Sequence, residues 1–360
     1  MKEYQQELIR KLDNGTGYLD IDGLRIEIKK VPDGSGSGKL DPRVLMEQES
    51  FFKKGVERGN EPSIEELRDN MGGFNYNLNT VEIYTKYLEV ETNSSKVPVW
   101  AYFPRSSQRD RNRKALLYVH GGAFFGGTVF AVENNCRLIA ERADCIVFNI
   151  DYSLAPENPY PIPCNQVYEA LKYIYTHSEE LGVDKRKIAM SGDSAGGNLT
   201  AVCAQMDRDK KTNYLKLEIL LYPKLTFTNH ELPGYWRNID AFYLVEEQKK
   251  YLERIIHIGS DESNEGDARV YVQGREDIKH PYISPTFGVK QELCKTVIIL
   301  AEYDGLRLEG EFYGKQLKEA KVPVRIIRYE GMTHGFFDKL GIFPQAESVV
   351  NEIACELKRL

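Results

Sequence analysis

Short apolar runs alternate with longer amphipathic stretches over most of the chain from residue 115 onward. The apolar runs have the length and composition of buried strands and cover residues 115–119, 145–150, 187–190, 217–221, 296–300 and 324–327. Most of them are separated by stretches with helical spacing, at residues 133–142, 165–181, 195–208, 308–320 and 345–360. Buried strands that alternate with helices predict an α/β fold with a mostly parallel central sheet and helices on both faces.

Three further segments lie outside this alternation. Residues 81–90 and 97–103 alternate residue by residue between apolar and polar side chains, which predicts two more strands. A segment over about residues 225–285 is rich in Tyr, Asn, Glu and His and separates two core strands, so we expect an inserted lid or cap there. Residues 1–80 lack the buried-strand pattern.

This N-terminal part carries helical patches at residues 44–56 and 64–71 and predicts an extension of helices and loops. The expected organisation is therefore an extension over residues 1–80 and one catalytic domain over residues 81–360.

A possible nucleophile lies between a predicted strand and a predicted helix, in the sequence Gly192-Asp193-Ser194-Ala195-Gly196. Gly-x-Ser-x-Gly in a strand–turn–helix setting is typical of a nucleophile elbow, whose tight turn requires small neighbours such as Gly192 and Gly196. The helix that follows directs its free N–H groups and positive dipole end toward the turn, which favours developing negative charge. We therefore expect Ser194 to be the nucleophile.

A possible oxyanion-binding loop directly follows the predicted strand at residues 115–119. Its sequence is His120-Gly121-Gly122-Ala123. Residues without bulky side chains leave backbone N–H groups free to face an oxyanion. We expect Gly121 and Gly122 to supply two donors and Ala195, directly after Ser194, to supply a third. The His120 side chain is expected to have a structural role.

A serine nucleophile needs a base and an orienting carboxylate. His334 follows the last predicted strand in a glycine-flanked loop, where this type of sheet places its active site. Asp304 follows the penultimate strand, and the order Ser194, Asp304, His334 is the one expected of an α/β-hydrolase. Glu302 and Asp338 are the alternative carboxylates. We do not expect the other five histidines to act as the base: His120, His177, His230, His257 and His280.

Composition narrows the partners and the compartment. The 360 residues carry a net charge of -6 without a strong basic run, so a nucleic-acid partner is not expected. The first residues are polar and no stretch reaches the ~20 apolar residues of a membrane helix, which favours the cytoplasm and no membrane contact. Six scattered cysteines without a Cys-x-x-Cys pair are typical of buried thiols in a reducing compartment. No metal-ligand spacing is present, so we expect neither metal nor cofactor.

Over roughly residues 100–360 the chain resembles the hormone-sensitive-lipase-type family of α/β-hydrolases, which includes small bacterial acetyl esterases. The resemblance depends on Val119–Gly122, Asp151–Glu157, Gly192–Gly197, Asp304–Arg307 and His334–Phe336. It implies an α/β-hydrolase fold, a cap built from the N-terminal segment and the insertion, hydrolysis of short-acyl esters, and often a homodimer formed along the last strand. The chain departs from the family pattern at Ala123, where a third glycine is usual, and at Gly305, where proline often follows the catalytic aspartate.

Three other functions of such a scaffold fit this sequence less well, and a fourth remains open. A non-catalytic ligand-binding homologue is expected to lose part of the triad, a prolyl peptidase needs a large propeller domain, and a long-chain lipase needs a wide apolar lid. A deacetylase of acylated carbohydrates remains an alternative, because the insertion carries aromatic residues suited to sugars: Tyr235, Trp236, Tyr243 and Tyr251. The same residues would serve equally well as cap packing.

Overall fold

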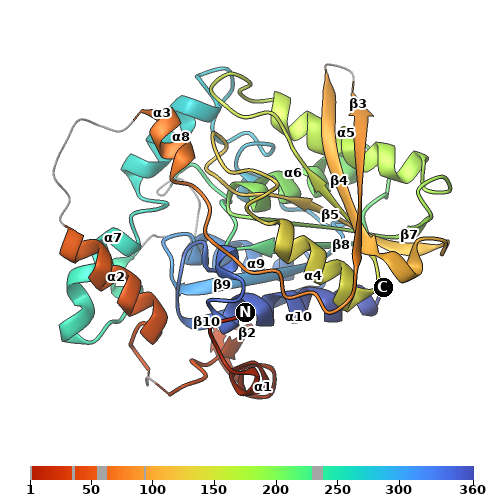
Figure 1. The fold of residues 1–360 in the computed structure, drawn as a ribbon. Helices are drawn as coiled ribbons and strands as arrows, with labels where there is room; N and C mark the ends of the chain where they lie inside the picture. Colours follow the sequence, from red (N-terminus) through yellow and green to blue (C-terminus); the bar gives the residue numbers. More distant parts are fainter. Residues whose placement is uncertain (1, 35–36, 55–62, 93–94, 229–237) are drawn as a thin grey trace.

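The computed structural model describes residues 2–34, 37–54, 63–92, 95–228 and 238–360. Their centre is a ten-stranded sheet in the order β1-β2-β10-β9-β8-β7-β5-β6-β4-β3 (Figure 1). The strands are β1 (Thr16–Ile21), β2 (Leu24–Lys29), β3 (Ile83–Glu91), β4 (Lys96–Pro104), β5 (Arg113–Val119), β6 (Ile146–Ile150), β7 (Val183–Asp193), β8 (Leu217–Leu221), β9 (Lys295–Tyr303) and β10 (Val324–Thr333).

The sheet is parallel through its middle and antiparallel at its ends. All pairings from β2 through β10, β9, β8, β7 and β5 to β6 are parallel, whereas β1 pairs with β2, β3 with β4 and β4 with β6 in antiparallel fashion. The mostly parallel α/β fold is thereby confirmed.

Helices cover both faces of the sheet. One face carries α4 (Glu133–Ala143) and α10 (Pro344–Lys358), with α1 (Gln6–Asn14) packed on α10, and the other carries α5 (Ile162–Thr176), α6 (Ala195–Asp209) and α9 (Arg307–Glu319). Each face has its own cluster of buried apolar side chains, so the strands between them are buried on both sides. This explains why the central strands appear in the sequence as continuous apolar runs.

The N-terminal segment contributes to the sheet as well as to its surroundings. β1 and β2 form a hairpin, and β2 pairs in parallel with β10 from Ile26 to Lys29. The expectation that residues 1–80 hold only helices and loops is therefore wrong for this hairpin. The sequence signal for this hairpin is Asp22-Gly23, a typical two-residue hairpin turn, followed by the alternation of apolar Leu24 and Ile26 with polar Arg25. In the structure both turn residues have positive φ, Leu24 and Ile26 are buried, and Arg25 is exposed.

The hairpin also changes which edge of the sheet is open. β2 pairs with the side of β10 that faces away from β9, so the last strand has neighbours on both sides. The edge of β10 that the resemblance implies for a homodimer is therefore occupied by β2 of the same chain. The outermost strand on this side is β1.

Several short helices gather at one end of the molecule, on the left of Figure 1. They are α2 (Pro42–Lys54), α3 (Ile64–Asp69), α7 (Leu252–Ile255) and α8 (Asp261–Tyr271), with the 3₁₀ turns η2 (Ile239–Ala241) and η3 (Glu246–Tyr251). The N-terminal helices contact the insertion, since the rings of Phe52 and Tyr251 lie 5.0 Å apart and Arg254 Nη2 donates to Gln48 Oε1 at 2.9 Å. Residues 55–56 of the predicted N-terminal helix and 229–237 of the predicted cap lie outside the described residues.

Two smaller expectations can be compared with the described part of the chain. Four cysteines are buried as expected (Cys136, Cys145, Cys164 and Cys203), Cys294 is partly buried, and Cys355 is exposed. No described helix combines the length and the apolar character that crossing a bilayer requires.

Candidate active site

Ser194 occupies a sharp turn between β7 and α6. Its backbone has φ 53° and ψ −117°, a conformation that non-glycine residues adopt only at an energetic cost of about 1–3 kcal/mol. The turn is held by the Ser194 N–H, which donates to Leu221 O at 2.9 Å. A Cβ on Gly192 would lie 2.4 Å from Gly196 O, and one on Gly196 would lie 2.0 Å from Val119 O. Both glycines are therefore required by the close approach of backbone to backbone.

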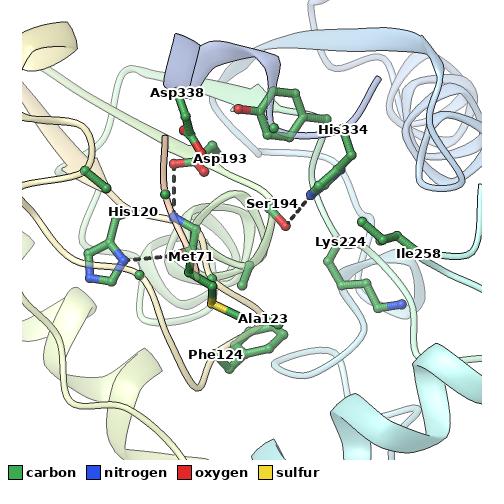
Figure 2. Close-up of a pocket in the computed structure, with 18 of the residues that line it drawn as sticks. Met71, His120, Ala123, Phe124, Asp193, Ser194, Lys224, Ile258, His334 and Asp338 are labelled. Carbon is green, nitrogen blue, oxygen red and sulfur yellow. Dashed lines mark hydrogen bonds between the residues drawn. The ribbon is translucent and has the colours of Figure 1, made fainter. Parts of the chain in front are cut away.

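Three side chains predicted from separate motifs form one hydrogen-bonded chain. His334 Nε2 lies 2.9 Å from Ser194 Oγ (Figure 2). On the other side of the ring, His334 Nδ1 lies 2.7 Å from Asp304 Oδ2. Asp304 is fully buried, and its other oxygen, Oδ1, accepts the Leu306 N–H at 2.9 Å. The nucleophile follows β7, the carboxylate follows β9 and the imidazole follows β10, so the parallel sheet brings the three loops to one edge.

The electrostatic surroundings of His334 favour its protonated form. Burial alone lowers the pKa of His334, but the charge and hydrogen bond of Asp304, with smaller contributions from Asp193 and Asp338, outweigh burial and raise it above the ordinary value. An imidazole with a raised pKa is a better acceptor for the serine proton. The arrangement can therefore generate a serine alkoxide equivalent without a metal ligand.

The alternative carboxylates and histidines lie elsewhere. Glu302 Oε2 accepts the Gly331 N–H at 2.8 Å, and Asp338 lies beside Asp193 rather than His334 Nδ1. Of the histidines in the described residues, only His334 bonds Ser194, and His230 falls outside them.

His120 is part of the framework of the neighbouring loop. Its ring stacks on Tyr152 with centroids 4.5 Å apart, and its Nδ1 lies 2.8 Å from Gly121 O. Burial lowers the pKa of His120 to about 4, so the ring is neutral at physiological pH.

The backbone N–H groups near Ser194 differ in what they bond. The Gly121 N–H donates to Asp193 Oδ1 at 3.0 Å, so this group is engaged by the protein, contrary to the expectation that it faces a substrate oxygen. Within the described residues the N–H groups of Gly122 and Ala123 have no acceptor, and Ala195 occupies the first position of α6, where an N–H has no partner in the helix. Gly122, Ala123 and Ala195 all line the pocket that contains Ser194.

The pocket is a cavity of about 250 Å³ with walls from distant parts of the chain. Figure 2 shows Ala123 and Phe124 on one side of Ser194 and Lys224 and Ile258 on the other. Met71 and Gly72 come from the N-terminal segment, whereas Ile258, Ser263 and Asp267 come from the insertion. No motif in the sequence identifies these wall residues, because they reach the site only through the packing of the two segments.

The sequence patterns also give no indication of the charged side chains on the insertion side of the pocket. Lys224 is buried, its Nζ donates to Asn264 Oδ1, and it lies 3.6 Å from Glu309 Oε1, whose carboxylate is also buried. Burial raises the pKa of Asp267, an effect that the charges of Lys224, His334 and His257 oppose. The wall therefore combines one compensated cation with an acidic group, an unusual lining for a purely apolar substrate.

The comparison with known proteins agrees with this geometry. A family model described as "alpha/beta hydrolase fold" matches residues 116–338, more than half of the chain. The chain belongs to the α/β-hydrolase family and, within it, to the hormone-sensitive-lipase type.

Particular relatives are esterases by name. The chain is 31% identical to "Esterase LipI" of Mycobacterium tuberculosis, over 69% of this chain and 74% of the relative. It is 32% identical to "Carboxylesterase NlhH" of the same species, over 73% and 78% of the two chains. Among solved structures, the hyperthermophilic esterase of the archaeon Pyrobaculum calidifontis superimposes with a TM-score of 0.72 at 26% identity, over 89% of this chain and 98% of that one.

Proposed function

We propose that the protein is a serine carboxylic-ester hydrolase that cleaves short-acyl esters, acetyl to about butyryl or hexanoyl, through an acyl-enzyme. The observation that carries this proposal is the chain of contacts from Ser194 Oγ to His334 and on to Asp304, at 2.9 and 2.7 Å. It is supported by membership of a family whose relatives are named esterases and carboxylesterases.

The roles of the three side chains follow from their geometry. His334 Nε2 takes the proton from Ser194 Oγ as the oxygen attacks the ester carbonyl, and it then gives the proton to the departing alcohol. Water then attacks the acyl-enzyme and loses a proton to His334. His334 returns this proton to Ser194 Oγ as the bond between the acyl group and the serine breaks and the acid leaves. Asp304 holds the imidazole with Nδ1 protonated and stabilises its positive form.

The oxyanion that forms in each step needs donors aimed at it. We assign this role to the N–H groups of Gly122, Ala123 and Ala195, because Gly121 is bonded to Asp193. Each such donor contributes about 2.7–4 kcal/mol to transition-state stabilisation in serine hydrolases. The methyl group of Ala123 leaves its N–H free, so the departure from a third glycine does not remove a donor.

The size of the pocket supports a short acyl chain. Its volume of about 250 Å³ is below the ~300–1,000 Å³ of sites that hold drug-sized ligands. Met71, Phe124 and Ile258 supply apolar surface for a few methylene groups.

A series of p-nitrophenyl esters from acetate to dodecanoate tests this proposal. We expect acetate or butyrate to give the highest kcat/KM and Ser194→Ala to lose essentially all activity while keeping its melting temperature. A wild-type protein that cleaves none of the esters, or a Ser194→Ala variant at full rate, would contradict the hydrolase assignment and favour a ligand-binding role.

A second candidate is deacetylation of acylated carbohydrates. The aromatic residues of the insertion do not support it: Tyr251 packs on Phe52, Tyr243 does not line the pocket, and Tyr235 and Trp236 lie outside the described residues. The polar pocket residues Lys224 and Ser263 favour a hydroxylated substrate instead. A kcat/KM for peracetylated xylose above that for ethyl acetate would select this candidate, and the reverse order would reject it.

A further inference from the structure

Two aspartates outside the triad face each other beside the active site. Asp193 is buried directly before Ser194, and Asp338 follows His334 by four residues. Figure 2 shows their carboxyl groups directed toward one another, and both residues line the pocket. Nothing in the proposed reaction uses either carboxyl group directly.

The hydrogen bonds of this pair are unequal. Asp193 Oδ1 accepts the Tyr118 hydroxyl at 2.9 Å and the Gly121 N–H at 3.0 Å. Asp338 is partly buried, and its Oδ1 is shielded from solvent without a partner among the described residues. A shielded carboxylate oxygen without a donor is destabilised, and a proton on one of two adjacent carboxyl groups removes that penalty.

Within the part of the chain that the structure describes, no cation neutralises both carboxylates. From the elements around them, the titratable groups that face the pair are Tyr118 of β5, Cys136 of α4, Tyr152 after β6, Tyr222 after β8, and His334 and Lys339 on the segment of Asp338. Only the last two can be positive, and His334 already pairs with Asp304.

The energetic balance agrees with the geometry. Burial raises the pKa of Asp193, although the Tyr118 and Gly121 hydrogen bonds oppose it. Burial, and then the charge of Asp193, raise the pKa of Asp338 to about 8. Two adjacent carboxyl groups that are this shielded from water do not both ionise at neutral pH.

We propose that Asp193 and Asp338 share one proton at neutral pH and that this carboxylic acid–carboxylate pair positions the oxyanion loop. The inference rests on the proposed ester hydrolysis for its catalytic part. Asp193 belongs to the nucleophile turn (residues 192–196) and accepts the Gly121 N–H of the oxyanion loop (residues 120–123). Asp338 belongs to the histidine loop (residues 334–338). One shared proton therefore links the three segments that carry the nucleophile, the oxyanion donors and the base. Both aspartates are positioning residues, because neither touches the reacting atoms.

Loss of the shared proton has a defined consequence. Above the pKa of Asp338, two negative charges repel each other between the nucleophile turn and the histidine loop. The hold of Asp193 on Gly121 weakens, and the donors of the neighbouring Gly122 and Ala123 move from their positions. Ester hydrolysis should therefore fall on the alkaline side even though His334 is then an unprotonated base.

The first test measures kcat for p-nitrophenyl butyrate from pH 6 to 9.5 in the wild type, Asp338→Asn and Asp338→Leu. A one-proton loss centred near 8 predicts a fall in wild-type kcat of about tenfold between pH 7 and 9. The asparagine amide donates a hydrogen bond at every pH, so Asp338→Asn should lack this fall. Asp338→Leu has no donor and should be at least about tenfold slower than Asp338→Asn at pH 7.

Glu218→Gln is the matched control. Glu218 is buried on β8, accepts the Thr296 hydroxyl at 2.7 Å, and has its pKa raised to about 8 by burial, yet it lies outside the pocket. Its replacement should leave the alkaline fall in kcat as it is in the wild type. An equal loss of the fall in both variants would overturn the positioning role.

Thermal unfolding tests the shared proton without any substrate. Below pH 4 Asp338 is protonated in both the folded and unfolded states; between about 4 and 8 only the folded protein keeps the proton, so wild-type stability falls as the pH rises. The melting temperature of Asp338→Asn minus that of the wild type should therefore increase from pH 5 to 8. A constant difference would overturn the shared proton, and this result is independent of whether the esterase assignment succeeds.

Discussion

Replacing Asp304 by asparagine tests the tautomer on which the proposed mechanism depends. The Leu306 N–H donates to Asp304 Oδ1 at 2.9 Å, so an asparagine would keep its carbonyl oxygen at this position. Its NH₂ group would then occupy the place of Oδ2, 2.7 Å from His334 Nδ1. Two donors cannot face each other, so Nδ1 would lose its proton and Nε2 would carry it. A protonated Nε2 cannot take the proton of Ser194.

The magnitude follows from charge as well as from the tautomer. A carboxylate about 4 Å from the centre of an imidazolium contributes roughly 4 kcal/mol at an effective dielectric constant of about 20. Each 1.36 kcal/mol changes a rate about tenfold, so the lost charge alone accounts for about 10³-fold. Together with the unfavourable tautomer we expect kcat/KM to fall by about 10³–10⁴-fold.

The assay is kcat/KM for p-nitrophenyl butyrate at pH 7.5, with urea unfolding to confirm that the variant is folded. Glu302→Gln is the matched control, because this carboxylate lies two residues away and bonds the Gly331 N–H instead of His334. We expect the control to stay within about threefold of the wild type. An Asp304→Asn variant within tenfold of the wild type would refute the assignment of Asp304 as the orienting carboxylate.

Three further outcomes follow from the structure. Because the surroundings of His334 raise its pKa and the base must be neutral, the acid limb of kcat/KM should have its midpoint above the ~6.5 of free histidine, and a midpoint below 6 would contradict this. Gly122→Ala should lower kcat by about 10²–10³-fold, since the new Cβ would lie 2.1 Å from Gly126 O and displace an oxyanion donor; Gly266→Ala, where a Cβ meets no atom within 4 Å, should leave kcat nearly unchanged. Ile26→Ala removes a fully buried side chain of β2 and should lower the free energy of unfolding by about 3 kcal/mol, against less than about 1 kcal/mol for exposed Arg25→Ala. Equal urea midpoints for the last two variants would mean that the hairpin does not stabilise the sheet.

Local patterns predict the central part of this protein because the interactions behind them are local. A strand buried on both faces needs a continuous apolar run, and a helix needs amphipathic spacing, so the alternation of the two predicts the parallel α/β sheet. Ser194 requires small neighbours in a tight turn, which appear in the sequence as Gly192 and Gly196. Asp304 and His334 each follow a core strand, and parallel strands bring their carboxyl ends to one edge.

Other features depend on contacts between distant segments. The hairpin of β1 and β2 has a recognisable turn at Asp22-Gly23, but its docking on β10 depends on which edge of the sheet is free. The pocket walls at Met71 and Ile258 come together only when the N-terminal segment and the insertion pack over the sheet.

The same distinction explains the oxyanion loop and the aspartate pair. Sequence alone determines that a glycine-rich loop follows β5, but not which N–H groups face the substrate. Tertiary structure decides this, because the carboxylate of Asp193 arrives from β7 and engages Gly121. It also brings Asp338 from the histidine loop to Asp193, and the low-dielectric surroundings that couple two carboxyl groups exist only in the folded chain.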